Sequence, residues 1–187
     1  MKFACSAPTM LLSAAILCST TAALAQAAAS DGDKHFVDAA LKGGMAEVEL
    51  GKLAADKGAS EDVKQFGQRM VADHEKLGEK MKTVAGEIGV TPPTMTTPSD
   101  MAKKAELEVL SGKSFDDAYI KAMLNDHQQD LDDFKKEVAD GSSPAVKRAA
   151  RQGETVISEH LALIRKIAAA HNVTAANEMK KPDPRGL

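Results

Sequence analysis

Cysteine is nearly absent from the chain, and its position matters more than its number. The only two, Cys5 and Cys18, lie within the first 25 residues. If that segment is removed, the mature protein has no cysteine. Disulfides, thiolate metal sites and a cysteine nucleophile are then all excluded, and stability has to come from an apolar core.

The first 25 residues have the layout of a secretory signal peptide. Lys2 supplies a positive start, residues 10–17 an apolar run, and Ala23-Leu24-Ala25 a small-x-small cleavage site. We therefore predict cleavage between Ala25 and Gln26 and a periplasmic or secreted protein. Leu17 stands before Cys18 where a lipoprotein signal needs a small residue, which argues against lipidation.

Aromatic residues, long apolar runs and basic clusters are also scarce. The chain has no Trp, one Tyr and five Phe, while Ala, Leu, Lys, Glu and Met are plentiful. That composition is typical of helices rather than sheets. The apolar run near the start is shorter than the ~20 residues of a membrane span, so no integral span is expected after cleavage. The formal charge of −3 without a basic block argues against a nucleic-acid partner.

Apolar residues recur at intervals of three, four and seven along four long segments, which predicts four amphipathic helices. The first runs from Lys34 to Lys57, before Gly58. The second follows Ser60, the third is expected to open with a capping box at Ser114 and Asp117, and the fourth has Pro144 in its first turn. A short helix from about residue 99 to 110 follows a proline-rich break (residues 91–98).

The lengths of the connections predict the topology. The first and last joins are short, so each joined pair should form an antiparallel hairpin. The middle connection is long enough to cross the length of a ~25-residue helix. We therefore predict an all-α, ferritin-like four-helix bundle, up-down-down-up, with a short helix in the crossover. The bundle spans residues 34–172, between a flexible leader (26–33) and a flexible tail (173–187).

Polar residues interrupt the apolar stripes at one level of the predicted bundle. His127 and His160 lie on the stripes of the third and fourth helices, and His74 lies ~50° from the centre of the second stripe. Glu47 adjoins a face of small residues on the first helix, including Gly43, Gly44 and Gly51. Those residues would either let another helix approach closely or leave space for a ligand.

Three imidazoles and a carboxylate form a reasonable ligand set for iron, manganese, zinc or copper. The sequence therefore predicts a metal site at Glu47, His74, His127 and His160. Neighbouring acids could accept hydrogen bonds from the imidazoles or ligate directly: Asp73, Asp126 and Glu159. Met70 and Met123 each precede a histidine by four residues, which would suit copper(I).

A structural role for the same residues is the competing hypothesis. Buried histidines are often satisfied by a carboxylate or a backbone group, and buried polar layers can fix how helices pair. Met70 and Met123 are then core residues. No catalytic residue is assigned, because the sequence has no HExxH motif and no phosphate-binding glycine loop.

Several ordered motifs resemble a bacterial family of exported proteins, domain of unknown function 4142. They are Phe36–Ala40, Gly44–Ala54, Val63–Phe66, Met70–His74 and Phe115–Tyr119 with His127, and His160 completes the pattern. The resemblance covers about Lys34 to His171 and implies an exported ferritin-like bundle without implying an activity.

One feature of the wider ferritin-like superfamily is missing. Its two-metal oxidases use a Glu-x-x-His motif on two helices. In this chain Val71 stands three residues before His74, and Ile157 stands three before His160. That difference weakens the expectation of a di-iron oxidase.

Three hypotheses follow from the sequence. The first is an exported bundle that binds a metal ion in its core, with an envelope stress role and no turnover. The second is a metal-free interaction module whose polar layer fixes helix register. The third is a metal-dependent oxidase or peroxide-consuming enzyme, which needs a redox metal with an open coordination position.

Overall fold

Five helices make up the part of the chain that the computed structural model describes, residues 28–174. They are α1 (Asp31–Lys57), α2 (Glu61–Ile88), α3 (Pro98–Glu108), α4 (Gly112–Asp140) and α5 (Pro144–His171). The predicted signal segment, the first residues of the leader and most of the tail lie outside the described residues. No described helix is long and apolar enough to cross a membrane.

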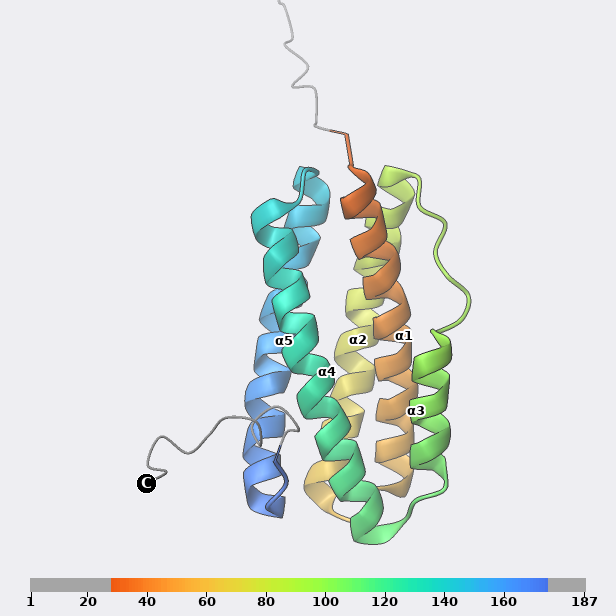
Figure 1. Ribbon diagram of the computed structural model, residues 1–187, viewed down its shortest axis with the longest axis vertical. Helices are drawn as coiled ribbons and strands as arrows, with labels where there is room; N and C mark the ends of the chain where they lie inside the picture. Colours follow the sequence, from red (N-terminus) through yellow and green to blue (C-terminus); the bar gives the residue numbers. More distant parts are fainter. Residues whose placement is uncertain (1–27, 175–187) are drawn as a thin grey trace, which may run out of the picture.

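The helices form the predicted up-down-down-up bundle. α1 and α2 make one antiparallel hairpin and α4 and α5 the other, while the crossover brings α3 down beside α1 (Figure 1). As a result α2 and α4 run in the same direction (Figure 1). The fold expected from connection lengths is therefore confirmed.

Two helices begin at residues other than those predicted from the sequence, and local capping groups explain the start of α1. α1 begins at Asp31, three residues before the predicted start, because Ser30 and Asp33 form a capping box. The predicted capping box at Ser114 and Asp117 is wrong. α4 begins at Gly112, a residue with positive φ, and Ser114 lies inside the helix.

Two buried carboxylates join the ends of the hairpins. Asp116 on α4 accepts hydrogen bonds from the backbone N–H groups of Ala59 and Ser60, both at 2.9 Å, and so satisfies the start of α2. At the other end of the bundle, Asp33 on α1 accepts from the N–H groups of Ser142 and Ser143 at 3.0 and 3.2 Å. These contacts fix each hairpin turn against the opposite hairpin.

The α1–α2 hairpin depends on two glycines that meet backbone to backbone. A Cβ added to Gly67 would lie 2.6 Å from the carbonyl oxygen of Gly51, and one added to Gly51 would lie 2.8 Å from that of Gly67. Gly43, Gly44 and Gly78 differ, since an added Cβ would meet no atom within 4 Å. The small-residue face therefore serves close packing at Gly51 and leaves open space at Gly43 and Gly44.

Candidate metal centre

Three histidines meet in the interior, each from near the middle of its helix. They are His74 on α2, His127 on α4 and His160 on α5, hereafter the His triad. One ligand nitrogen from each lies within 4.8 Å of the others. The ring centroids are 5.2 to 5.9 Å apart. His127 and His160 are fully buried, and His74 is 3 % exposed.

Hydrogen bonds set the tautomers of two of these rings. The Nδ1 of His127 is 3.0 Å from the backbone oxygen of Met123, which can only accept, so Nδ1 donates. The Nε2 of His160 is 2.8 Å from Oδ2 of Asp73 and donates to that carboxylate. When the rings are neutral, Nε2 of His127 and Nδ1 of His160 therefore each carry a free lone pair.

Among residues 28–174, those two nitrogens have no hydrogen-bond partner, and neither nitrogen of His74 has one. Leaving a buried polar atom unpaired costs about 1–3 kcal/mol, so several in one place call for a physical reason. A bound cation would provide that reason, because the unpaired nitrogens would then be its ligands. Metal-ligating histidines usually donate their other N–H to a carboxylate or a backbone carbonyl, as His160 and His127 do here.

Burial also favours the neutral form of the three imidazoles, which is the form that binds metal. Burial, followed by repulsion from the neighbouring imidazoles, lowers the pKa of His74 and of His127 to about 3 each. Burial also lowers the pKa of His160, against an opposing effect of Asp73. At neutral pH all three rings are uncharged, and a neutral imidazole is the form that binds metal.

A surface network holds Asp73 in place beneath His160. Arg69 lies one helical turn before Asp73, 3.2 Å from it, and also pairs with Glu159 at 2.7 Å. Burial alone would raise the pKa of Asp73, but hydrogen bonds from His160 and Arg69 outweigh it and lower the pKa. Asp73 is therefore a carboxylate that orients His160. Arg69 was not singled out from the sequence, although its position four residues before Asp73 was a usable signal.

The predicted acids do not all gather at the triad. Asp126 pairs with Lys103 of α3 at 2.7 Å, and Glu159 pairs with Arg69. Glu47 is buried on α1 but does not belong to the group of mutually close ligand atoms. It lines a cavity of about 100 Å³ together with Lys103, Asp126 and Asp130.

Glu47 is nevertheless unusual. Its Oε2 has no partner, and burial followed by repulsion from Asp126 and Asp130 raises its pKa well above the ordinary value. The buried hydroxyl of Tyr119 is also unpartnered, and burial together with the charge of Glu47 raises its pKa. Burial at this position therefore favours the neutral form of the Glu47 carboxyl group.

The other residues considered in the sequence as ligands lie elsewhere in the bundle. Met70 and Met123 are fully buried among the core side chains. Phe66 packs edge-on against His127 and His160, with centroids 6.3 and 6.1 Å away, and closes that side of the triad. His171 binds Asp62 near the end of α5, at 3.0 Å.

The arrangement defines an all-helical bundle of the ferritin-like class with a buried group of histidines at mid-height. Solved structures support that class. A DUF305 fragment from Deinococcus radiodurans is 16% identical with a TM-score of 0.68, covering 76% of this chain and 99% of that one. A candidate secreted DUF305 protein from Streptomyces coelicolor is 16% identical with a TM-score of 0.66, covering 78% and 96%.

A third similar structure carries the ferritin-like description itself. It is a two-domain protein from Anabaena variabilis with DJ-1/ThiJ/PfpI-like and ferritin-like domains. It is 16% identical with a TM-score of 0.56, and the match covers 85% of this chain and 42% of that one. At such identities the likeness concerns the fold alone.

The family follows from the sequence match. The chain belongs to the family described as Domain of unknown function (DUF4142), whose model matches residues 18–167. The resemblance noted from the motifs is thus confirmed. No curated protein matches the chain.

Proposed function

We propose that this protein is an exported helical bundle that binds one zinc or copper ion through the His triad, without turnover. The observation that carries the proposal is the convergence of buried, unpartnered imidazole nitrogens from three helices. Export is supported by the signal-peptide layout of residues 1–25. An envelope stress role would consist of holding such an ion away from other ligands.

The donor set favours zinc or copper within the wider group expected from sequence. Imidazole suits both ions, whereas manganese prefers carboxylate and water oxygens, and the non-haem iron sites of oxygenases combine two imidazoles with a carboxylate. Metal–nitrogen bonds are about 2.0–2.1 Å, which places ligating nitrogens ~3.5 Å apart. The triad nitrogens, within 4.8 Å of one another, need to move together by only ~1 Å.

A structural layer without metal is the second candidate. The observation in its favour is that the His160–Asp73–Arg69 network is complete within the protein. It leaves both nitrogens of His74, Nε2 of His127 and Nδ1 of His160 unexplained. The oxidase hypothesis has less support, because no carboxylate belongs to the group of close ligand atoms.

The test is replacement of His127 by Leu, which removes a ligand and leaves an apolar core residue. We expect the unmodified protein to bind one equivalent of zinc(II) or copper(I) and its melting temperature to rise. Binding at 100 times Kd is worth about 2.7 kcal/mol. His127→Leu should lose both effects and, without metal, should melt at the same temperature or higher.

His171→Ala is the matched control, since His171 lies on α5 but bonds to Asp62 outside the triad. It should bind metal as the unmodified protein does. The protein is purified without a metal-affinity tag or chelator, and metal is measured by elemental analysis and by calorimetric titration. Unchanged binding in His127→Leu would refute the site.

A further inference from the structure

A groove between α1 and α2 leads to the least enclosed member of the triad. It has a volume of about 710 Å³, and His74 lies at its inner side. His127 and His160 have no exposed surface, whereas His74 retains a little. His74 also borders a smaller cavity of about 80 Å³, which is lined by Leu77 of α2 and Ile157 of α5 among others.

His74 is also the least restrained of the three rings. Hydrogen bonds fix His127 to Met123 and His160 to Asp73, but neither nitrogen of His74 has a partner. A ring without hydrogen bonds can turn about its side-chain torsions at low cost, provided that it has room. Such a ring is suited to meet an incoming ion first.

The room comes from two glycines that the helix packing does not need. Gly44 on α1 and Gly78 on α2 both line the groove, and a Cβ at either would meet no atom within 4 Å. They contrast with Gly51 and Gly67, where a Cβ would strike the opposite backbone. Any side chain larger than glycine at position 44 or 78 would project into this open space.

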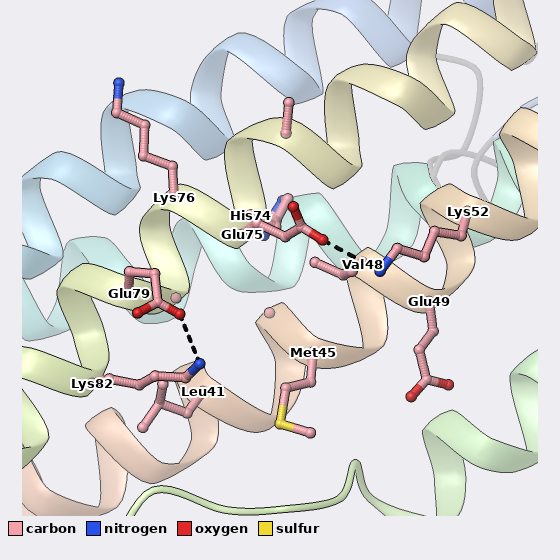
Figure 2. Close-up of a pocket in the computed structure, with 13 residues that line it drawn as sticks. Leu41, Met45, Val48, Glu49, Lys52, His74, Glu75, Lys76, Glu79 and Lys82 are labelled. Carbon is pink, nitrogen blue, oxygen red and sulfur yellow. Dashed lines mark hydrogen bonds and ion pairs between the residues drawn. The ribbon is translucent and has the colours of Figure 1, made fainter.

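The mouth of the groove is held by one exposed ion pair between the two helices. Lys52 of α1 and Glu75 of α2 are 3.2 Å apart, and Glu75 directly follows His74 (Figure 2). A second pair, Lys82 with Glu79 at 2.8 Å, runs along α2 (Figure 2). Exposed ion pairs are weak and exchange readily with water. The Lys52–Glu75 pair therefore closes the groove only loosely. Glu75 and Glu79 are carboxylates in its lining, beside Lys52 and Lys82.

From these observations we infer that the α1–α2 groove is the route by which the metal ion reaches the triad, with His74 as the ligand that captures it. The inference rests on the proposed metal site. The route explains why a site with two fully enclosed ligands can load without unfolding of the bundle. Gly44 and Gly78 keep it open, and His74, which belongs to both the groove lining and the triad, passes the ion to His127 and His160.

The test compares rates with affinity. Gly78→Leu fills the groove at a position that is not itself a ligand, and Gly86→Leu is the control, because Gly86 also has open space on α2 but does not line the groove. Zinc(II) uptake and release are followed by stopped flow with a chromophoric zinc indicator. We expect Gly78→Leu to slow both rates by about tenfold or more with Kd nearly unchanged, and Gly86→Leu to change neither.

A chemical block covers the case in which Gly78→Leu does not fold. In a chain whose Cys5 and Cys18 are serine, Gly78→Cys is folded first and then capped with a benzyl methanethiosulfonate. Capping should slow zinc uptake, and removal of the cap by a phosphine reductant should restore it. Gly86→Cys, treated in the same way, should not respond.

The outcomes separate the two proposals. Unchanged rates in Gly78→Leu or in capped Gly78→Cys would overturn the route and leave the His triad site standing. A weaker Kd with an unchanged uptake rate would also overturn it, since position 78 would then act on the bound state. If the unmodified protein takes up no zinc(II) or copper(I), the proposed function fails and the route fails with it.

Discussion

At the scale of single residues, the partner of each imidazole decides which of its nitrogens can bind a metal. A backbone carbonyl holds Nδ1 of His127, and a carboxylate holds Nε2 of His160. The two rings therefore leave different nitrogens free to bind a metal, Nε2 of His127 and Nδ1 of His160. That choice depends on Met123 and Asp73 rather than on the histidines themselves.

Glu47 was predicted as a fourth ligand, but its carboxylate does not belong to the group of close ligand atoms. Replacing it with Gln keeps its shape and removes a carboxyl group whose ionisation burial and nearby Asp126 oppose. We expect Glu47→Gln to bind zinc(II) or copper(I) with an affinity within about threefold of the unmodified protein, since the three imidazoles remain. Calorimetric titration measures this.

A large loss of affinity in Glu47→Gln would instead make Glu47 the fourth ligand, as the sequence predicted. Glu49→Gln is the control on the same helix. Glu49 is partly exposed and pairs with Lys104 of α3, away from the triad. Neither result depends on a change of fold, because both substitutions preserve side-chain volume.

A second carboxyl group gives a pH-dependent prediction. Burial and the adjacent Asp33 raise the pKa of Glu137 from 4.5 to about 7. Because the folded pKa lies above the unfolded one, ionisation opposes folding, and stability is lost as pH rises from about 4.5 through 7. Glu137→Gln should remove a loss of about 1–2 kcal/mol between pH 5 and pH 8, after allowance for solvent screening.

Urea unfolding at a series of pH values measures that difference. The exposed Glu106, replaced by Gln, is the control for the loss of a surface carboxylate. Parallel profiles for Glu137→Gln and the unmodified protein would show that the Asp33–Glu137 contact does not couple to folding.

At the scale of the helices, the glycines of α1 and α2 have two opposite structural roles. Gly51 and Gly67 bring α1 and α2 into backbone contact, while Gly44 and Gly78 hold space open. The sequence placed Gly43, Gly44 and Gly51 near one face but could not separate these roles. The distinction depends on where the facing helix lies, which is a tertiary property.

Substitution by alanine tests that distinction. Gly67→Ala would press a methyl group against the Gly51 carbonyl and should destabilise the protein by about 1–3 kcal/mol. Gly78→Ala meets open space and should stabilise α2 by about 0.5–1 kcal/mol, because glycine is a poor helix former. Urea unfolding compares the two, and effects of equal sign and size would contradict the packing described here.

Helix ends show where sequence reasoning succeeded and failed. The prediction of Pro144 in the first turn of α5 is confirmed, and Ser143 caps that helix. Ser60 precedes α2 as expected, but its hydroxyl binds Asp116 of α4 instead of capping its own helix. Local motifs predict a cap well only when no distant carboxylate competes for the same groups.

At the scale of the whole molecule, connection lengths were enough to predict the topology. Two short turns and one long crossover leave few ways to arrange four helices, and the structure has the expected one. α3 is more than a spacer. Its Lys103 and Lys104 pair with Asp126 of α4 and Glu49 of α1, and its Leu107 is buried.

Part of the site was also predictable from the sequence. Helical period and position along each helix placed three histidines at one level, and the structure brings them together. The same rules put Glu47 at that level too, but its carboxylate is not among the mutually close ligand atoms. A helical wheel gives a direction and a height, and it does not say toward which neighbour a long flexible side chain turns.

The most direct test of the His triad site is X-ray absorption spectroscopy of the protein loaded with one equivalent of zinc(II) or copper(I). The account predicts three imidazole nitrogens at about 2.0 Å and no sulfur neighbour from Met70 or Met123. His127→Leu should lose that signature. A first shell of oxygens alone, or a spectrum that His127→Leu leaves unchanged, would contradict the account.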